Sequence, residues 1–178
     1  MKKLALIPLF LAAGFSVSAN ATNTYVGMMM GIQNISTSTA RFRGMRPGAF
    51  IGYGQMMSED FYLAGELNAS FSATISDNAD AGAESTRSTF MTTLGILPGM
   101  MINNVSMTYL RIGGAYSRFS GASANLYGLV TGLGLETALT PDWSMRIEYD
   151  LTTFRGSSGL STPRSDEAFM SMKYTFDV

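Results

Sequence analysis

The segment LVTGLGLETALTPDWSMRIEYDLTTF, residues 129–154, decides how this chain folds. It contains two runs in which apolar and polar residues alternate, joined across Thr140-Pro141-Asp142. The second run alternates most regularly, setting Met145, Ile147, Tyr149 and Leu151 against Ser144, Arg146, Glu148 and Asp150. A period of two residues is typical of β-strands whose two faces meet different surroundings. The segment therefore predicts a β-hairpin, while the pattern alone leaves open which face lies inside.

The first 21 residues have the features of a secretory signal peptide. Two lysines precede an apolar stretch over residues 4–17, and Ala19-Asn20-Ala21 places small residues where signal peptidase reads. The stretch is too short and wrongly flanked for a membrane-spanning helix, which argues against a retained anchor. We therefore expect cleavage before Thr22, with residues 22–178 forming a single barrel domain.

The composition of the mature chain limits its fold and its partners. Its 157 residues suffice for one domain, such as an eight-stranded barrel with loops. Without Lys2 and Lys3, ten basic residues remain against 13 acidic ones, and a net charge of −3 gives no indication of a nucleic-acid partner. There is no cysteine, so packing and hydrogen bonds must supply the stability. After Val17 no apolar run approaches the ~18 residues of a spanning helix, so membrane crossing would require strands.

Strand-like alternation recurs along the whole mature sequence. We expect eight strands, over residues 24–34, 47–55, 61–74, 88–100, 105–119, the two arms of the hairpin from about 125 to 154, and 168–176. The connections alternate in length: the short ones are 56–60, 101–104 and 140–142, and the longer polar ones are 35–46, 75–87, 120–124 and 155–167. This alternation is typical of an up-and-down outer-membrane barrel, whose long loops lie outside the cell.

Six charged residues on one face of these strands indicate which face is inside. They are Glu66, Arg111, Glu136, Arg146, Glu148 and Lys173. At ~3.3 Å per residue, with neighbouring strands running in opposite directions, they form one layer nearer the short turns. Three acids balance three bases, and enclosed charges must be paired because burying them alone is costly. The charged face is therefore predicted to be the interior, and the apolar face to contact lipid, where closing the sheet satisfies every backbone polar group.

The hairpin also predicts one specific ion pair. A three-residue turn over residues 140–142 places Leu139 opposite Trp143, and therefore Glu136 opposite Arg146. The aromatic residues of the outward face give separate support for a membrane barrel, because they fall at two heights. We expect one girdle of Tyr53, Phe61, Trp143, Tyr174 and Phe176 near the short turns and another of Phe71, Phe90, Tyr116 and Tyr127.

Four stretches of the chain resemble the small outer-membrane barrel superfamily, which includes the transmembrane domain of outer-membrane protein A and opacity-type surface proteins. They are GAFIGYGQMMSEDFYLAGELN from Gly48, YLRIGGAYSR from Tyr109, LETALTPDWSMRIEYD from Leu135, and the closing MSMKYTF. The resemblance implies an all-β, eight-stranded antiparallel transmembrane barrel in the Gram-negative outer membrane, inserted by the barrel-assembly machinery. It also implies that Glu66, Arg111, Glu136 and Arg146 belong to an inward cluster that plugs the lumen. No peptidoglycan-binding domain is expected.

The sequence gives little support for catalysis or for a bound cofactor. It contains no histidine and no cysteine, and the enzymes among outer-membrane barrels resemble one another in needing a histidine as base or orienter. Glu66 and Glu136 could be considered as an acid/base pair, but cations match them in the same layer. Asp77, Asp80 and Glu84 lack the spacing of a calcium loop. We therefore predict no catalytic residue, no metal and no cofactor.

Three arginines in the first long connection, Arg41, Arg43 and Arg46, form the one basic cluster of the sequence. Guanidinium groups pair well with phosphate, so these residues are candidates for contact with lipopolysaccharide, although a solvated loop explains them equally well. The leading functional hypothesis is a non-enzymatic surface protein whose loops serve envelope integrity or contact host surface molecules. The alternatives are a small pore and a lipid A-modifying enzyme of unfamiliar type.

Overall fold

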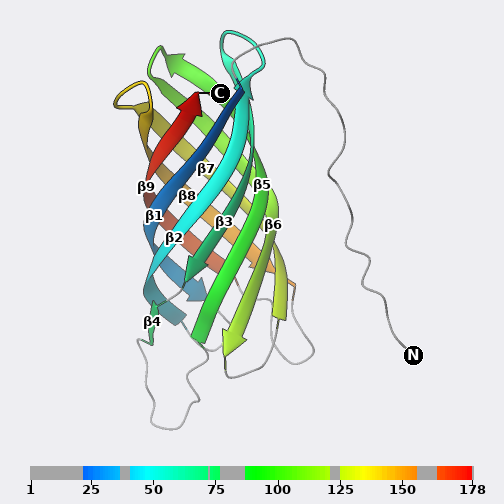
Figure 1. Cartoon of the computed structure of the whole chain (residues 1–178). Helices are drawn as coiled ribbons and strands as arrows, with labels where there is room; N and C mark the ends of the chain where they lie inside the picture. Colours follow the sequence, from blue (N-terminus) through cyan, green and yellow to red (C-terminus); the bar gives the residue numbers. More distant parts are fainter. Residues whose placement is uncertain are drawn as a thin grey trace, which may run out of the picture.

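The chain folds into a closed antiparallel β-barrel (Figure 1). The structure, a computed structural model, describes residues 22–36, 41–71, 73–76, 87–120, 125–155 and 164–177. Its strands are β1 (Thr22–Ser36), β2 (Arg41–Met56), β3 (Phe61–Phe71), β4 (Ala73–Ser76), β5 (Arg87–Asn103), β6 (Ser106–Ser120), β7 (Asn125–Ala138), β8 (Trp143–Phe154) and β9 (Arg164–Asp177). The expected signal peptide lies outside the described residues.

The nine labelled strands occupy eight strand positions around the barrel, which are called staves here. β1 pairs with both β2 and β9, which closes the sheet. β3 pairs with residues 48–56 of β2, and β4 continues along the same strand by pairing with residues 42–45. β3 and β4 therefore occupy one stave, and the predicted eight-stranded up-and-down barrel is confirmed.

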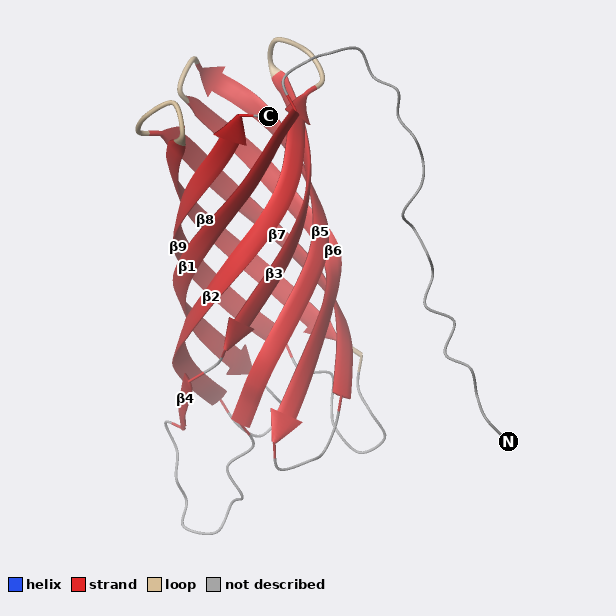
Figure 2. Cartoon of the chain, in the orientation of Figure 1, coloured by secondary structure: helices blue, strands red, loops and turns tan. Residues whose placement is uncertain are grey.

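The two ends of the barrel differ in how its strands are joined (Figure 2). Residues 57–60, 104–105 and 139–142 make three short turns at one end, called here the short-turn end. At the other, the far end, the strands are joined by segments 37–40, 77–86, 121–124 and 156–163. The predicted hairpin is present, because the backbone N–H of Leu139 donates to the carbonyl of Trp143 at 2.8 Å.

The strands extend further toward the far end than the sequence pattern predicts. Residues 35–46 were expected to form a long loop, but β1 reaches Ser36, which pairs with Arg41 of β2. Likewise β9 begins at Arg164, within the loop expected over residues 155–167. The boundaries were wrong because apolar alternation stops where lipid stops, whereas the hydrogen-bond ladder continues between polar residues.

The inward and outward faces follow the predicted alternation. On β8 the outward Trp143, Ile147 and Tyr149 are about half exposed, while the inward Arg146 and Glu148 are buried. Outward aromatic rings also pack in pairs at both predicted heights: Trp143 lies against Tyr174, and Tyr116 lies 5.3 Å from Tyr127 between ring centroids. Among the residues that the structure describes, no helix is long and apolar enough to cross a membrane.

Inward tyrosines cover glycines on neighbouring strands. The register sets Tyr25 of β1 opposite Gly52 of β2, and Tyr109 of β6 opposite Gly134 of β7. A Cβ atom added at either glycine would lie 2.2 Å from the opposing ring, so only glycine leaves room for it. The hydroxyl groups of both rings meet charged side chains of the lumen, because Tyr25 donates to Glu66 and Tyr109 donates to Glu148.

Candidate functional site

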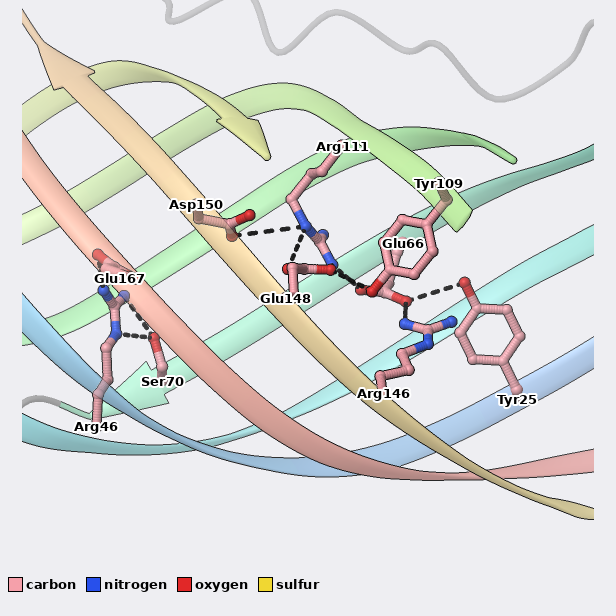
Figure 3. Close-up of polar contacts among 10 residues, drawn as sticks. All are labelled: Tyr25, Arg46, Glu66, Ser70, Tyr109, Arg111, Arg146, Glu148, Asp150 and Glu167. Carbon is pink, nitrogen blue, oxygen red and sulfur yellow. Dashed lines mark hydrogen bonds and ion pairs between the residues drawn. The ribbon is translucent and has the colours of Figure 1, made fainter. Parts of the chain in front are cut away.

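Glu66 of β3 lies at the centre of the lumen and joins three other staves (Figure 3). Its carboxylate accepts hydrogen bonds of 2.6 Å from Arg111 Nη2 of β6 and 2.6 Å from Arg146 Nη1 of β8. The Tyr25 hydroxyl of β1 donates to the same carboxylate at 3.0 Å. Glu66 is only 1% exposed, so these contacts provide the compensation that an enclosed carboxylate requires.

Arg146 is held both by carboxylates and by aromatic rings. Its Nε donates to Glu136 Oε2 at 2.5 Å, in addition to the bond with Glu66. Its guanidinium carbon lies 5.1, 5.0 and 5.3 Å from the ring centroids of Tyr25, Phe50 and Tyr109. Arg146 Nη2 has no hydrogen-bond partner among the described residues, and these cation–π contacts compensate in part for its burial.

Arg111 forms the second half of the central cluster. It holds Glu148 through two bonds, Nε to Oε1 at 2.8 Å and Nη2 to Oε2 at 2.9 Å. Two parallel bonds of this kind fix the planes of the guanidinium and the carboxylate relative to each other, and such pairs are among the stronger ion pairs. The Tyr109 hydroxyl also donates to Glu148 at 2.5 Å. Asp150 lies at the edge of this arrangement. Its Oδ2 is 3.6 Å from Arg111 Nε, and its Oδ1 has no hydrogen-bond partner within the part of the chain that the structure describes.

Lys173 of β9 completes the layer on the side of the short turns. Its ammonium pairs with Glu136, so that carboxylate is shared between Lys173 and Arg146. A pocket of about 170 Å³ lies against this pair, and Tyr62, Met107 and Ser144 are among its lining residues. Its lining also includes Asn104 and Val105 of a short turn, so the pocket lies at the short-turn mouth of the lumen.

The structure places all six residues of the predicted charge layer inside the barrel and links them by ion pairs. The register sets Glu136 directly opposite Arg146, as the three-residue turn predicts. Asp150 has the same inward parity but was left out of the predicted layer. The aromatic cage around Arg146 was also missed, and the signal that could have revealed it is the inward parity of Tyr25, Phe50 and Tyr109.

The prediction for Arg46 is wrong. Arg46 lies in β2 and points inward, where it is 2% exposed and pairs with Glu167 of β9. Its Nε donates to Ser70 Oγ at 2.8 Å, and Gln33 of β1 donates to Glu167 at 2.8 Å. This second cluster lies apart from the central one (Figure 3). Arg46 shares the parity of the inward Phe50, so extending the strand would have predicted its orientation.

The other two arginines of the predicted loop cluster also lie in β2. Arg43 is exposed and has the outward parity of Met45 and Ile51, whereas the side chain of Arg41 is outside the description. The three arginines therefore form no single cluster, because alternate residues of a strand face opposite sides.

The described residues contain no group of three or more His, Cys, Asp or Glu side chains that could hold a metal ion. The expectation about Asp77, Asp80 and Glu84 concerns residues outside the description. In the central cluster Glu66, Glu136 and Glu148 each contact at least one cation. The chemistry available to these groups is mutual neutralisation in an enclosed space, which ties the staves of the barrel together.

Comparisons with known proteins agree with this architecture. Residues 4–176 match the model of the outer membrane protein β-barrel domain family. No curated protein sequence matches the chain. Among solved structures, Neisserial surface protein A is 18% identical with a TM-score of 0.63, over 86% of this chain and 97% of that protein. Ail, the attachment invasion locus protein of Yersinia pestis, solved with the heparin analogue sucrose octasulfate, is 13% identical with a TM-score of 0.61, over 88% and 99%.

At these identities the two structures show a shared fold. The family model adds more, because it covers nearly the whole chain. The chain therefore belongs to the outer membrane protein β-barrel family, whose place is the outer membrane of Gram-negative bacteria.

Proposed function

We propose that this chain is a non-enzymatic surface protein whose closed barrel presents its far-end segments outside the cell, for envelope integrity or host contact. The observation that carries this proposal is the filled lumen. Glu66 is bonded to side chains from three other staves, so ion pairs cross the interior from wall to wall. An eight-stranded barrel has an interior only about wide enough for side chains. Contact with other molecules is therefore left to the two ends and the outer wall.

The orientation follows from the general architecture of these barrels, in which short turns face the periplasm and longer loops face outward. The far end carries the segments 77–86 and 156–163, which are longer than any of the short turns. Two of the similar structures belong to proteins whose names refer to the surface or to attachment, namely Neisserial surface protein A and Ail. These names support a surface role for the present chain without specifying a ligand.

Orientation is tested by cysteine labelling on intact cells, since the chain has no cysteine of its own. We expect a membrane-impermeant maleimide to label Thr37→Cys, Asp80→Cys and Ser158→Cys while failing to label Asn103→Cys. Lysed cells provide the control, in which all four should react. Labelling of Asn103→Cys alone on intact cells would show the reverse orientation and contradict the proposal.

Mass analysis of the mature chain would test the expected cleavage before Thr22.

Conduction separates this proposal from the pore alternative. Purified protein in planar bilayers should show no stable open channel, because Arg111, Arg146 and their carboxylate partners fill the lumen. Sustained ohmic conductance from a monodisperse sample would favour the pore. Incubation with lipid A, followed by mass spectrometry of the lipid, tests the enzymatic alternative, for which we expect no change in lipid mass.

A further inference from the structure

The outward charges of the barrel are distributed unequally between its two ends. Among the side chains that the structure describes, the outward basic residues all lie at the far end: Arg43, Arg118, Arg155 and Arg164. The described acids of the short turns, Glu59, Asp60 and Asp142, have no basic residue beside them in those turns. The far end therefore offers positive charge on the wall of the barrel, beside the lipid and not only in the loops.

Three of these arginines gather on four adjacent staves. Arg43 of β2 is opposite Asn34 of β1, and Asn34 is in turn opposite Asp166 of β9. Arg164 of β9 lies two residues from Asp166, on the same outward face. Strands lie ~4.8 Å apart, so Arg43 and the β9 pair are roughly 10 Å from each other across β1.

Arg155 brings a third guanidinium to the same area. It directly follows β8, and its backbone N–H donates to the carbonyl of Tyr127 at 2.8 Å. Arg164 is opposite Thr153, so Arg155 is its diagonal neighbour across β8 and β9. Asp166 is the one described acid in this group, 3.8 Å from Arg164 in an exposed pair. The group thus carries three positive charges against one negative charge.

The wall below Arg43 is apolar, and its side chains are flexible. One outward position from Arg43 toward the short-turn end, the row across β2, β1, β9 and β8 is Met45, Ile32, Ala168 and Tyr149, and the next is Pro47, Met30, Met170 and Ile147. Arg164 lies two outward positions above the first of these rows on β9, and Arg155 lies three above it on β8. Met30, Met45 and Met170 are all more than half exposed. Methionine side chains are unbranched and flexible, so such a surface adapts to irregular apolar partners.

We propose that this wall of β8, β9, β1 and β2 at the far end binds a phosphorylated, multiply acylated glycolipid of the outer leaflet. The phosphates would contact the guanidinium groups of Arg43, Arg155 and Arg164, since guanidinium forms charge-assisted hydrogen bonds with phosphate. The acyl chains would lie along the methionine rows beneath. The occupant is identified by this complementarity, because the wall combines clustered positive charge with an adjacent apolar strip.

The binding surface depends on the proposed function, since the glycolipid can reach it only if the far end lies in the outer leaflet. It deepens that function by naming a partner for the barrel wall. It also differs from the sequence-based expectation for Arg41, Arg43 and Arg46, because Arg46 is replaced by two arginines more than 100 residues away in the sequence.

The test measures lipid binding to the purified barrel by native mass spectrometry. The probes are bisphosphorylated lipid A, its dephosphorylated form, and phosphatidylglycerol. We expect Arg43→Gln, Arg155→Gln and Arg164→Gln each to weaken binding of bisphosphorylated lipid A, and the triple variant to lose about tenfold or more. Asp166→Asn should strengthen binding, because it removes the one acid of the group. Heat-modifiable gel mobility verifies that each variant is folded.

Arg118→Gln is the matched control, because it removes the same charge from the same end of the barrel but on β6. We expect it to change affinity by less than about twofold, which is within ordinary surface effects. An equal loss in Arg118→Gln and Arg164→Gln would mean that the rim attracts anions generally and would overturn the proposal. Equal binding of the dephosphorylated lipid, or of phosphatidylglycerol, would overturn it as well. The labelling experiment on Ser158→Cys reports separately whether the orientation is right.

Discussion

Removal of Glu136 or Arg146 tests the central cluster most directly. Breaking a buried ion pair by removing one partner typically costs ~3–5 kcal/mol, because the other charge stays enclosed. In Glu136→Ala, Arg146 keeps its 2.6 Å bond to Glu66, but Lys173 loses its carboxylate partner. In Arg146→Ala, Glu136 keeps Lys173, while Phe50 and Tyr109 lose the cation that lies over their rings. Because these contacts remain, we expect each single variant to lose ~3 kcal/mol of stability, which is the lower limit of that range.

The double variant should lose clearly less than the sum of the two single losses. Once both side chains are absent, neither leaves the other unpaired, and groups in direct contact show coupling energies of ~0.5–3 kcal/mol. We expect ~1–2 kcal/mol here, because each partner has a second contact. The free energy of unfolding is measured by reversible urea titration in lipid vesicles, following the mobility shift between folded and unfolded protein. Additivity within ~0.3–0.5 kcal/mol would refute the pairing.

A second cycle provides the control. Arg146 and Arg46 belong to separate clusters and have no carboxylate partner in common among the described contacts. Arg46→Ala should be costly alone, since Gln33 and Ser165 are then the donors that remain to the enclosed Glu167 among its described contacts. Combined with Arg146→Ala, its effect should be additive. Coupling in both cycles would indicate general loosening of the barrel instead of specific pairing.

Two further predictions concern the wall of the barrel and the glycines of the lumen. Leu133→Arg should destabilise the barrel by ~2–4 kcal/mol if Leu133 lies near the bilayer midplane, which urea unfolding in vesicles measures; tolerance equal to that of Ser158→Arg would contradict the lipid-facing assignment. Gly134→Ala should cost ~1–3 kcal/mol in the same assay because it displaces the Tyr109 ring, whereas Gly114→Ala, where a Cβ meets nothing within 4 Å, should be nearly neutral.

The fold and the central charge layer could be predicted from the sequence because both depend on parity. A strand residue has only two directions to face, and a barrel in lipid gives those directions opposite chemistry. Arg146 and Glu136 could be assigned inward because each has a charge of opposite sign at a similar depth. The turn at Pro141 then fixed their register, which the structure reproduces.

The apolar pattern does not predict the second cluster, because its strands continue beyond the apolar band. Pro47 and Gly48 interrupt the apolar alternation, so Arg46 was assigned to a loop although its parity is inward. The pattern likewise places Glu167 in a loop, because the apolar alternation begins only after the start of β9. The aromatic cage around Arg146 was not predicted from the sequence, because tyrosine and phenylalanine are favoured on either face of a strand. The inward parity of these rings gives their direction, and the register, which sets Tyr109 opposite a glycine, shows that this ring has room inside.

The second cluster bears on the proposed lipid surface, because the two lie on opposite faces of the same staves. Arg46, Glu167 and Gln33 join β2, β9 and β1 from the inside, through an ion pair and a 2.8 Å hydrogen bond. The outward Arg43 and Arg164 lie three residues from Arg46 and Glu167 in their respective strands. These inner contacts hold the strands at a fixed spacing, and so they set the distance between the outward guanidinium groups before a lipid binds. A prearranged site loses less conformational entropy on binding, which favours affinity without any additional contact. The inner ion pair would therefore contribute to recognition on a surface that it does not touch.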